Sequence, residues 1–161
     1  MKRQPTRGIV LPAALFLGAL APACALSPPL QNGGAAKASP GVQVAVVGQS
    51  CEQSVESDLP GVDLVETTVQ VQVRNAGPTQ LTIHREAFDL RGPEGEAIPT
   101  STWCAREPLS VDPGQTRTFN LRFVSRGGPS CTQPMQLEPS SAITAGTSPI
   151  GIGAVTFVPR A

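Results

Sequence analysis

Four cysteines carry most of the chemistry that this 161-residue chain could perform: Cys24, Cys51, Cys104 and Cys131. Thiols form disulfides in oxidising compartments, and as thiolates they attack electrophiles or bind soft metals. If consecutive strands of the fold run up and down, the last three cysteines lie at one end of it, so spacing alone does not select a pair. We predict a Cys104–Cys131 disulfide, with Cys51 as the alternative partner, because this crosslink would restrain two long loops.

The same three thiols define an alternative function, a periplasmic thiol- or metal-handling protein that uses Cys51, Cys104 and Cys131. The sequence argues against it, because it has no Cys-x-x-Cys motif and a single histidine, His84. Soft-metal sites usually combine such ligands at close spacing. His84 falls on the polar side of a predicted strand, so we expect a solvated imidazole. We therefore predict no metal and no other cofactor.

Acidic residues surround one predicted loop and would offer oxygen ligands to calcium: Glu52, Glu56, Asp58, Asp63 and Glu66. Their spacing fits no calcium-binding loop, so we interpret them as a solvated acidic face. The sequence also lacks a Gly-x-Ser-x-Gly or Ser-x-x-Lys motif with a partner base. These observations predict a protein that is not an enzyme and that has no catalytic residue.

The N-terminus has the pattern of an export signal. Three basic residues among the first seven precede a 13-residue apolar run, Gly8–Leu20, which is shorter than a membrane span and typical of a signal peptide. The next residues, Leu20-Ala21-Pro22-Ala23-Cys24, resemble the lipobox of bacterial lipoproteins, although Ala21 and Pro22 depart from it.

The lipobox resemblance implies a signal peptide over residues 1–23 and a lipid on Cys24, which becomes the new N-terminus. The Ala25 that follows implies the outer membrane if the cell is Gram-negative. Two or three acyl chains would make this membrane attachment stable. Cleavage by an ordinary signal peptidase at a neighbouring small residue is the alternative, and it would release a freely secreted protein.

Residues 24–41 follow as the lipidated cysteine and a flexible linker. This segment is dense in Pro, Gly, Ala and Ser and shows no hydrophobic periodicity, so it cannot bury enough apolar surface to offset its ordering entropy. A linker of this kind would hold a folded domain clear of the lipid headgroups. The remaining residues, 42–161, are predicted to form that domain.

The clearest strand of the domain runs through Val65–Arg74, where four valines and a threonine alternate with polar residues. Successive side chains of a strand point to opposite faces, so this pattern predicts one buried and one solvated face. Asn75-Ala76-Gly77-Pro78 then supplies turn residues. Shorter alternating segments occur at 42–49, 81–90, 109–111, 119–123, 135–137 and 150–157, with an irregularity at 85–87.

Two further features complete the fold prediction. The polar segment Cys51–Gly61 is predicted to be a loop, and a change of parity between Ile152 and Val155 predicts a β-bulge near Gly151–Ala154. About seven short strands separated by turns are typical of an all-β protein, an immunoglobulin-like antiparallel β-sandwich. In such a sandwich Trp103 is predicted to pack on the disulfide in the core, with an exposed partner anchor as the alternative.

Three motifs carry a family resemblance: Val-x-Val-x-Asn-x-Gly at 71–77, Phe-x-Leu-x-Gly at 88–92, and Leu-x-Val-x-Pro-Gly-Gln-Thr-x-x-Phe-x-Leu-x-Phe at 109–123. They resemble a bacterial group of immunoglobulin-like secreted proteins and lipoproteins of unknown function, related in fold to the mycobacterial immunoprotective antigen. The resemblance covers about Val65–Val124, and Arg91 stands where the family usually has Asp. It implies the sandwich fold and an envelope location, and it transfers no catalytic residue.

The net charge of the mature chain argues against nucleic acid as its partner. Removing the three basic residues of the signal leaves nine basic against twelve acidic residues, and no basic patch interleaved with aromatics suggests nucleic-acid binding. We therefore predict a non-catalytic lipoprotein of the bacterial cell envelope, attached to the membrane by its N-terminal lipid. It would be a binding or scaffolding module for another envelope protein. A freely secreted ligand-binding domain is the other alternative.

Overall fold

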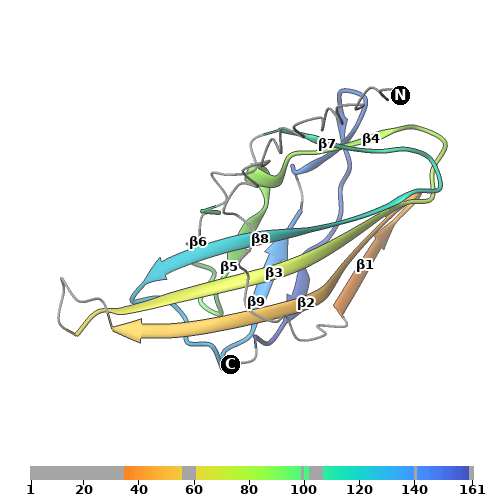
Figure 1. Ribbon diagram of the computed structural model, residues 1–161. Helices are drawn as coiled ribbons and strands as arrows, with labels where there is room; N and C mark the ends of the chain where they lie inside the picture. The colour runs from red at the N-terminus through yellow and green to blue at the C-terminus, as the bar shows by residue number, and fades with distance from the viewer. Residues whose placement is uncertain (1–34, 56–60, 99, 102–106, 140, 160–161) are drawn as a thin grey trace, which may run out of the picture.

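The computed structural model describes residues 35–55, 61–98, 100–101, 107–139 and 141–159. These residues form antiparallel strands in two layers (Figure 1), so the predicted all-β sandwich is confirmed. The strands are β1 (Ala35–Ser39), β2 (Val42–Val55), β3 (Asp63–Asn75), β4 (Leu81–Ile83), β5 (Asp89–Arg91), β6 (Ala97–Ile98), β7 (Leu109–Val111), β8 (Thr116–Arg126), β9 (Met135–Glu138), β10 (Ile143–Ala145), β11 (Ser148–Pro149) and β12 (Val155–Phe157). Several of the predicted strands are thus divided into shorter ones.

The first layer is a long sheet with the strand order β1-β2-β3-β8. Its central strand, β3, contains the alternating valines, and the predicted buried face is confirmed because Val69, Val71 and Val73 are fully buried. Val71 lies opposite Val46 of β2 on one side and Phe119 of β8 on the other. Two such neighbours on the same face give the sheet a continuous apolar surface.

The second layer consists of two short sheets, with the orders β11-β10-β4-β7 and β12-β9-β5-β6. Both face the long sheet. Ile83 and Ile143 of the first short sheet and Leu90 and Leu137 of the second are fully buried. They belong to one apolar cluster with the valines of the long sheet. A single core therefore holds all three sheets together.

Two interruptions send the chain from one short sheet to the other. The irregularity predicted at 85–87 is a 3-10 turn, Arg85–Ala87, which separates β4 from β5. Gly151–Ala154 plays the same part between β11 and β12. The predicted β-bulge there is wrong, because Ile152 and Val155 do not share a strand: each reaches the core from a separate segment.

The β2–β3 hairpin extends further than predicted. The loop expected over Cys51–Gly61 is wrong for Cys51–Val55, which continues β2 and pairs with Asp63–Thr67 of β3. The side chains of 52–55 are exposed, so they lack the burial pattern that marks a strand. Backbone pairing and one side-chain hydrogen bond, from Gln53 to Asp63, hold this part of β2 in the sheet.

The predicted flexible linker is also partly wrong. Ala35–Ser39 forms β1 and pairs with Val42–Val46, so the folded domain begins before Val42. Residues rich in alanine carry no strand signal of their own, but the exposed edge of β2 offers backbone partners that order them. The rest of the linker and the signal peptide over 1–23 lie outside the described residues. Within the described part of the chain, no helix is long and apolar enough to cross a membrane.

Asn75 ties the β3–β4 turn to the end of β7 and the turn that follows it, at one end of the sandwich. Its side chain is completely buried, and its Nδ2 donates to the carbonyl oxygens of Thr79 (2.8 Å) and Val111 (2.9 Å). Its Oδ1 accepts from the backbone N–H of Gly77 at 3.0 Å. The backbone N–H of Asn75 donates to Gln115 in the turn before β8. The turn predicted after Arg74 is therefore confirmed, and the amide is the centre of a satisfied polar network.

Candidate functional site

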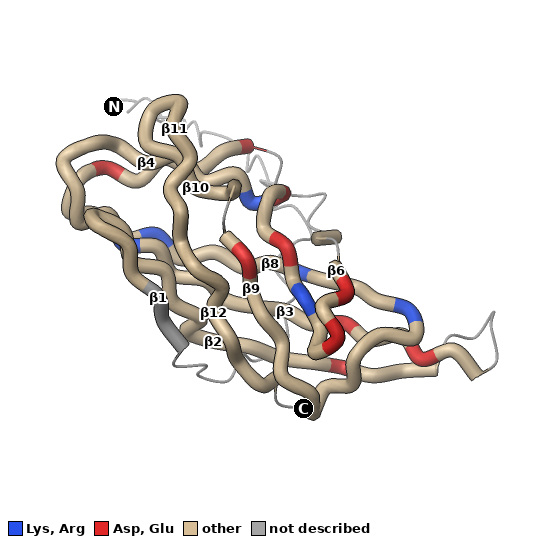
Figure 2. The backbone as a smooth tube through the Cα atoms, turned by 180° about the vertical axis from the view of Figure 1, so that it is seen from behind, with Lys and Arg blue, Asp and Glu red and all other residues tan. Residues whose placement is uncertain are grey.

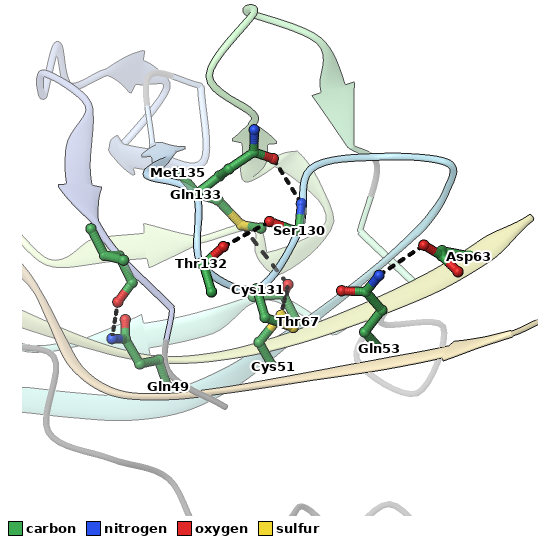
Figure 3. The surroundings of a disulfide bond; sticks show 11 residues. Gln49, Cys51, Gln53, Asp63, Thr67, Ser130, Cys131, Thr132, Gln133 and Met135 are labelled. Carbon is green, nitrogen blue, oxygen red and sulfur yellow. Dashed lines mark hydrogen bonds between the residues drawn. A yellow bond between two sulfur atoms is a disulfide. The ribbon is translucent and has the colours of Figure 1, made fainter.

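A disulfide joins Cys51 of β2 to Cys131 in the loop between β8 and β9 (Figure 3), with a Cα–Cα distance of 5.5 Å. The favoured pairing of Cys104 with Cys131 is wrong, and the alternative partner, Cys51, is the one used. The error follows from the predicted loop: with Cys51 extended along β2, its side chain lies on the inner face of the long sheet, where the 127–134 loop crosses. Cys104 lies outside the described residues.

The disulfide is buried between the long sheet and the 127–134 loop. Cys51 and Cys131 are 4% and 6% exposed and form a small buried cluster with Val65. The hydroxyl of Thr67 lies 3.5 Å from Cys51 Sγ and 3.9 Å from Met135 Sδ. A disulfide buried in this way is a structural crosslink, because catalytic and redox-sensing thiols need access to solvent.

Other predicted site residues do not converge. His84 is partly exposed, and its Nδ1 lies 3.5 Å from Glu86 Oε1. Asp63 accepts a hydrogen bond from Gln53, and Glu66 pairs with a neighbouring arginine across the sheet. Among the described residues, no three potential metal ligands gather in one place. Cys24, Trp103, Glu56 and Asp58 lie outside the described residues, so lipidation of Cys24 stays a prediction.

A pocket of about 510 Å³ opens at the end of the sandwich that Asn75 organises. Three turns or strand ends form it: the β1–β2 turn, the β3–β4 turn and the segment around β10 and β11. Its lining is small and largely apolar: Pro40, Gly41, Val42, Asn75, Ala76, Gly77, Pro78, Thr79, Leu81, Ala145 and Ile150. No titratable side chain is in this lining.

Close contact between two turns shapes the pocket floor. The backbone N–H of Ala76 donates to the carbonyl oxygen of Gly41 at 2.8 Å. A Cβ on Gly41 would lie 3.2 Å from the Cα of Gly77, and Gly41 has a φ of +79°. Both constraints require glycine at position 41. The β1–β2 turn can therefore lie against the β3–β4 turn, and together they leave a recess beside Leu81.

The pocket adjoins a stretch of the chain that carries no charge. No charged residue occurs from Pro139 to Pro159, a stretch that includes β10, β11 and β12. Seen from behind, these strands are free of charge while acidic and basic residues gather around β5, β6 and β9 (Figure 2). We call β10–β12 with the pocket the uncharged side. On the charged side, the hydrogen bond and charge of Glu138 raise the pKa of Arg91.

The uncharged side offers a ligand mainly apolar surface and few free polar groups. Asn75 is the pocket's one amide, and both its Nδ2 hydrogens and its Oδ1 have partners within the protein, so it has little left to offer a ligand. Recognition here would rest on shape and apolar contact, and depletion of charge is typical of the centres of protein interfaces. Sequence reasoning missed this site. The charge-free run was visible in the sequence, but the pocket depends on how distant turns pack.

No protein-family model and no curated protein matches this sequence. Comparison of the structure finds the candidate lipoprotein ycdA of Bacillus subtilis, at 15% identity and a TM-score of 0.60, which covers 80% of this chain and 39% of that one. A functionally unknown protein of Listeria monocytogenes matches at 13% identity and a TM-score of 0.54, over 81% of this chain and 85% of that one. This chain therefore spans well under half of ycdA.

The secreted protein MPT63 of Mycobacterium tuberculosis is also among the similar structures, at 17% identity and a TM-score of 0.39, over 78% of this chain and 98% of that one. At that TM-score the likeness does not establish membership of the family that the sequence motifs resemble. The likeness to ycdA and to the Listeria protein supports the fold alone. The chain is an antiparallel β-sandwich protein similar in fold to these two bacterial proteins.

Proposed function

We propose that this protein is a non-catalytic binding module of the bacterial cell envelope. A lipid on Cys24 would hold it to the membrane, and the uncharged side would contact another envelope protein. Two features support this: the lipobox-like segment that ends at Cys24, and a folded domain whose uncharged side could contact another protein. Freely secreted and lipid-anchored forms would share that body and differ only in the anchor.

The observation that carries this proposal is the buried Cys51–Cys131 disulfide. Structural disulfides persist in oxidising compartments and are rare in the cytosol, where thiols are kept reduced. The crosslink closes over residues 80 positions apart, so it restrains most of the domain. Such a bond supports an exported protein, in agreement with the predicted signal peptide.

The disulfide also weakens the case for a thiol- or metal-handling protein. Two of the three thiols on which that function depends, Cys51 and Cys131, are bonded to each other and buried. A buried disulfide exchanges slowly with external thiols because the attacking thiolate cannot reach either sulfur. The third thiol, on Cys104, would have to act without them.

The intact mass of the mature protein tests the anchor and the thiols together. When the full-length chain is expressed in a bacterial host, we expect a chain that begins at Cys24 and carries a lipid. Alkylation under non-reducing, denaturing conditions should then label one thiol, that of Cys104, because lipidation and the disulfide occupy the other three. The variant Cys104→Ser should label none.

Two results would contradict this part of the proposal. A mature chain without lipid, beginning after Ala23 or after Ala25, would replace the anchored protein by the secreted one. Three labelled thiols, or a bound metal that alkylation displaces, would instead favour the thiol- or metal-handling function.

The contact surface can be tested in living cells by site-specific photo-crosslinking. Thr147 lies exposed in the β10–β11 turn on the uncharged side, and Glu94 lies exposed in the turn before β6 on the charged side. A photo-reactive residue at position 147 should give one discrete crosslinked envelope protein, while position 94 should give little or none. Crosslinks at position 94 alone, or equal crosslinks at both, would rule out the uncharged side as the contact surface.

A further inference from the structure

The outer edge of β8 from Thr116 to Asn120 is a long sheet edge with which no described segment pairs, and Arg117 is its one charged residue. Sheet edges normally carry devices against pairing with other chains: short strands, proline, lysine or a bulge. β1 has five residues and is followed by Pro40, and β11 ends in Pro149. β6, β7 and β12 are two or three residues long.

β8 differs from these edges in length and regularity. It has 11 residues and pairs with β3 through an unbroken register from Thr116 to Arg126. Figure 1 shows it along the border of the long sheet opposite β1. Its first half, Thr116-Arg117-Thr118-Phe119-Asn120, contains no proline, lysine or glycine. Thr116, Arg117, Thr118 and Asn120 are exposed, and no described segment pairs with their outer side.

One contact shows which backbone groups face outward. The backbone N–H of Ser101 donates to the carbonyl oxygen of Arg122 at 2.7 Å, and Thr100 bridges Phe123. The carbonyl of Arg122 therefore points away from β3. Backbone groups of a strand alternate in direction from one residue to the next, so Thr116, Thr118 and Asn120 also present their N–H and C=O groups at the free edge. At Ser101 this edge already accepts an added extended segment.

The same edge is complementary to itself. In an antiparallel pairing of two copies around a two-fold axis at Thr118, Thr118 faces its own copy, Thr116 faces Asn120, and Arg117 faces Phe119. The backbone groups of Thr116, Thr118 and Asn120 face outward in each copy. The pairs Thr116–Asn120, Thr118–Thr118 and Asn120–Thr116 would then exchange about six backbone hydrogen bonds. No like charges are opposed in this register.

Neighbouring registers fit less well. An axis at Arg117 would oppose two guanidinium groups, and like charges directly opposite each other destabilise a sheet. An axis at Phe119 would bring the carbonyl of Arg122 into the new pairing, although Ser101 already occupies it. The axis at Thr118 avoids both conflicts. We propose that two copies of this chain pair through β8 around Thr118, so that their long sheets form one continuous eight-stranded sheet.

Sedimentation of the full-length chain tests this dimer. The chain would carry Cys24→Ala, so that no acyl chain drives association. We expect a reversible dimer whose fraction rises with concentration. Thr118→Pro should raise the Kd of the dimer at least about tenfold, because it removes two hydrogen bonds per dimer. The Thr118 N–H faces outward, so this edge proline should leave the monomer folded.

Charge placed at the two-fold axis gives a second measurement that does not depend on proline. Thr118→Lys and Thr118→Glu should each be monomeric, and an equimolar mixture of the two should form a heterodimer. Gln43→Lys puts the same charge on the same face of the sheet but two strands away in β2, and it should dimerise like the parent. A parent chain that stays monomeric at every concentration, or a dimer that Thr118→Lys leaves intact, would overturn the proposal.

Discussion

Loss of the Cys51–Cys131 disulfide is expected to lower the free energy of unfolding by roughly 4 kcal/mol. The two cysteines are 80 residues apart in sequence, and closing a loop of that size removes much of the conformational entropy of the unfolded chain. The double variant Cys51→Ala with Cys131→Ala tests this by chemical denaturation. This loss is a large part of the free energy of unfolding of a typical domain. The denaturation midpoint should therefore fall sharply.

The expected loss has a specific location. The 127–134 loop contacts the long sheet through Cys131 and Val65, and the end of β2 beyond Cys51 has exposed side chains. Without the crosslink, amide hydrogens of the outer β2–β3 hairpin, around Gln53 and Leu64, should exchange first in hydrogen-exchange measurements. Amides of Val69–Val73, which lie in the main core, should remain protected.

Two controls separate the crosslink from the packing of the sulfur atoms. The wild-type protein with its disulfide reduced keeps both sulfurs, so it should show most of the loss while avoiding the cavity that alanine leaves. Cys104→Ser should leave the stability of the oxidised protein nearly unchanged. Equal stability of the oxidised and reduced forms would show that the crosslink is not the restraint that we describe.

Replacing Asn75 by aspartate is the second large effect, with an expected loss of roughly 3–5 kcal/mol near neutral pH. The substitution keeps the size of the side chain but removes both Nδ2 hydrogens. The carbonyl oxygens of Thr79 and Val111 would lose their donor, and a buried carboxylate would lie against them. Asn75→Asp therefore places an unpaired charge where the native amide joins the β3–β4 turn to the end of β7.

The loss should depend on pH in one direction. A carboxyl beside two carbonyl oxygens binds its proton more tightly in the folded state than in the unfolded state, so stability falls as the pH rises and the carboxyl ionises. The variant should thus be closest to wild type in acid and furthest from it near neutrality. Denaturation of both proteins across this pH range measures the difference directly.

Asn120→Asp is the matched control for this substitution. Asn120 is exposed on β8 of the monomer, so at a protein concentration where the chain is monomeric the same exchange of amide for carboxyl should change stability by only about 0.5 kcal/mol. If Asn75→Asp were as mild as Asn120→Asp, then Asn75 would not hold the turns together. The shape of the pocket that these turns form would then need another explanation.

Local patterns in the sequence determined the elements that the core depends on. The alternation through Val65–Arg74 is sufficient to place β3 and its buried face, because a strand with one buried face has apolar residues at every second position. The turn at Asn75–Pro78 and the interruption at Arg85–Ala87 were predictable for the same reason: both depend on a few adjacent residues. The antiparallel sandwich follows from the number and spacing of such segments.

Elements that depend on distant partners were not predictable in this way. β1 and the outer part of β2 have no burial pattern of their own, and only pairing along an existing strand makes them strands. That pairing carries Cys51 to the inner face of the sheet, where it meets Cys131. The choice between Cys51 and Cys104 therefore rests on a strand end that the sequence presents as a polar loop.

The candidate contact surfaces divide in the same way. The absence of charge from Pro139 to Pro159 is a property of the sequence, whereas the pocket exists only because the turns at Gly41 and Gly77 lie against each other. The exposed edge of β8 likewise depends on which strand ends the sheet. Hydrophobic periodicity predicts whether a side chain is buried, but it does not predict which strand or turn lies beside it. Only the tertiary structure decides which segments are neighbours.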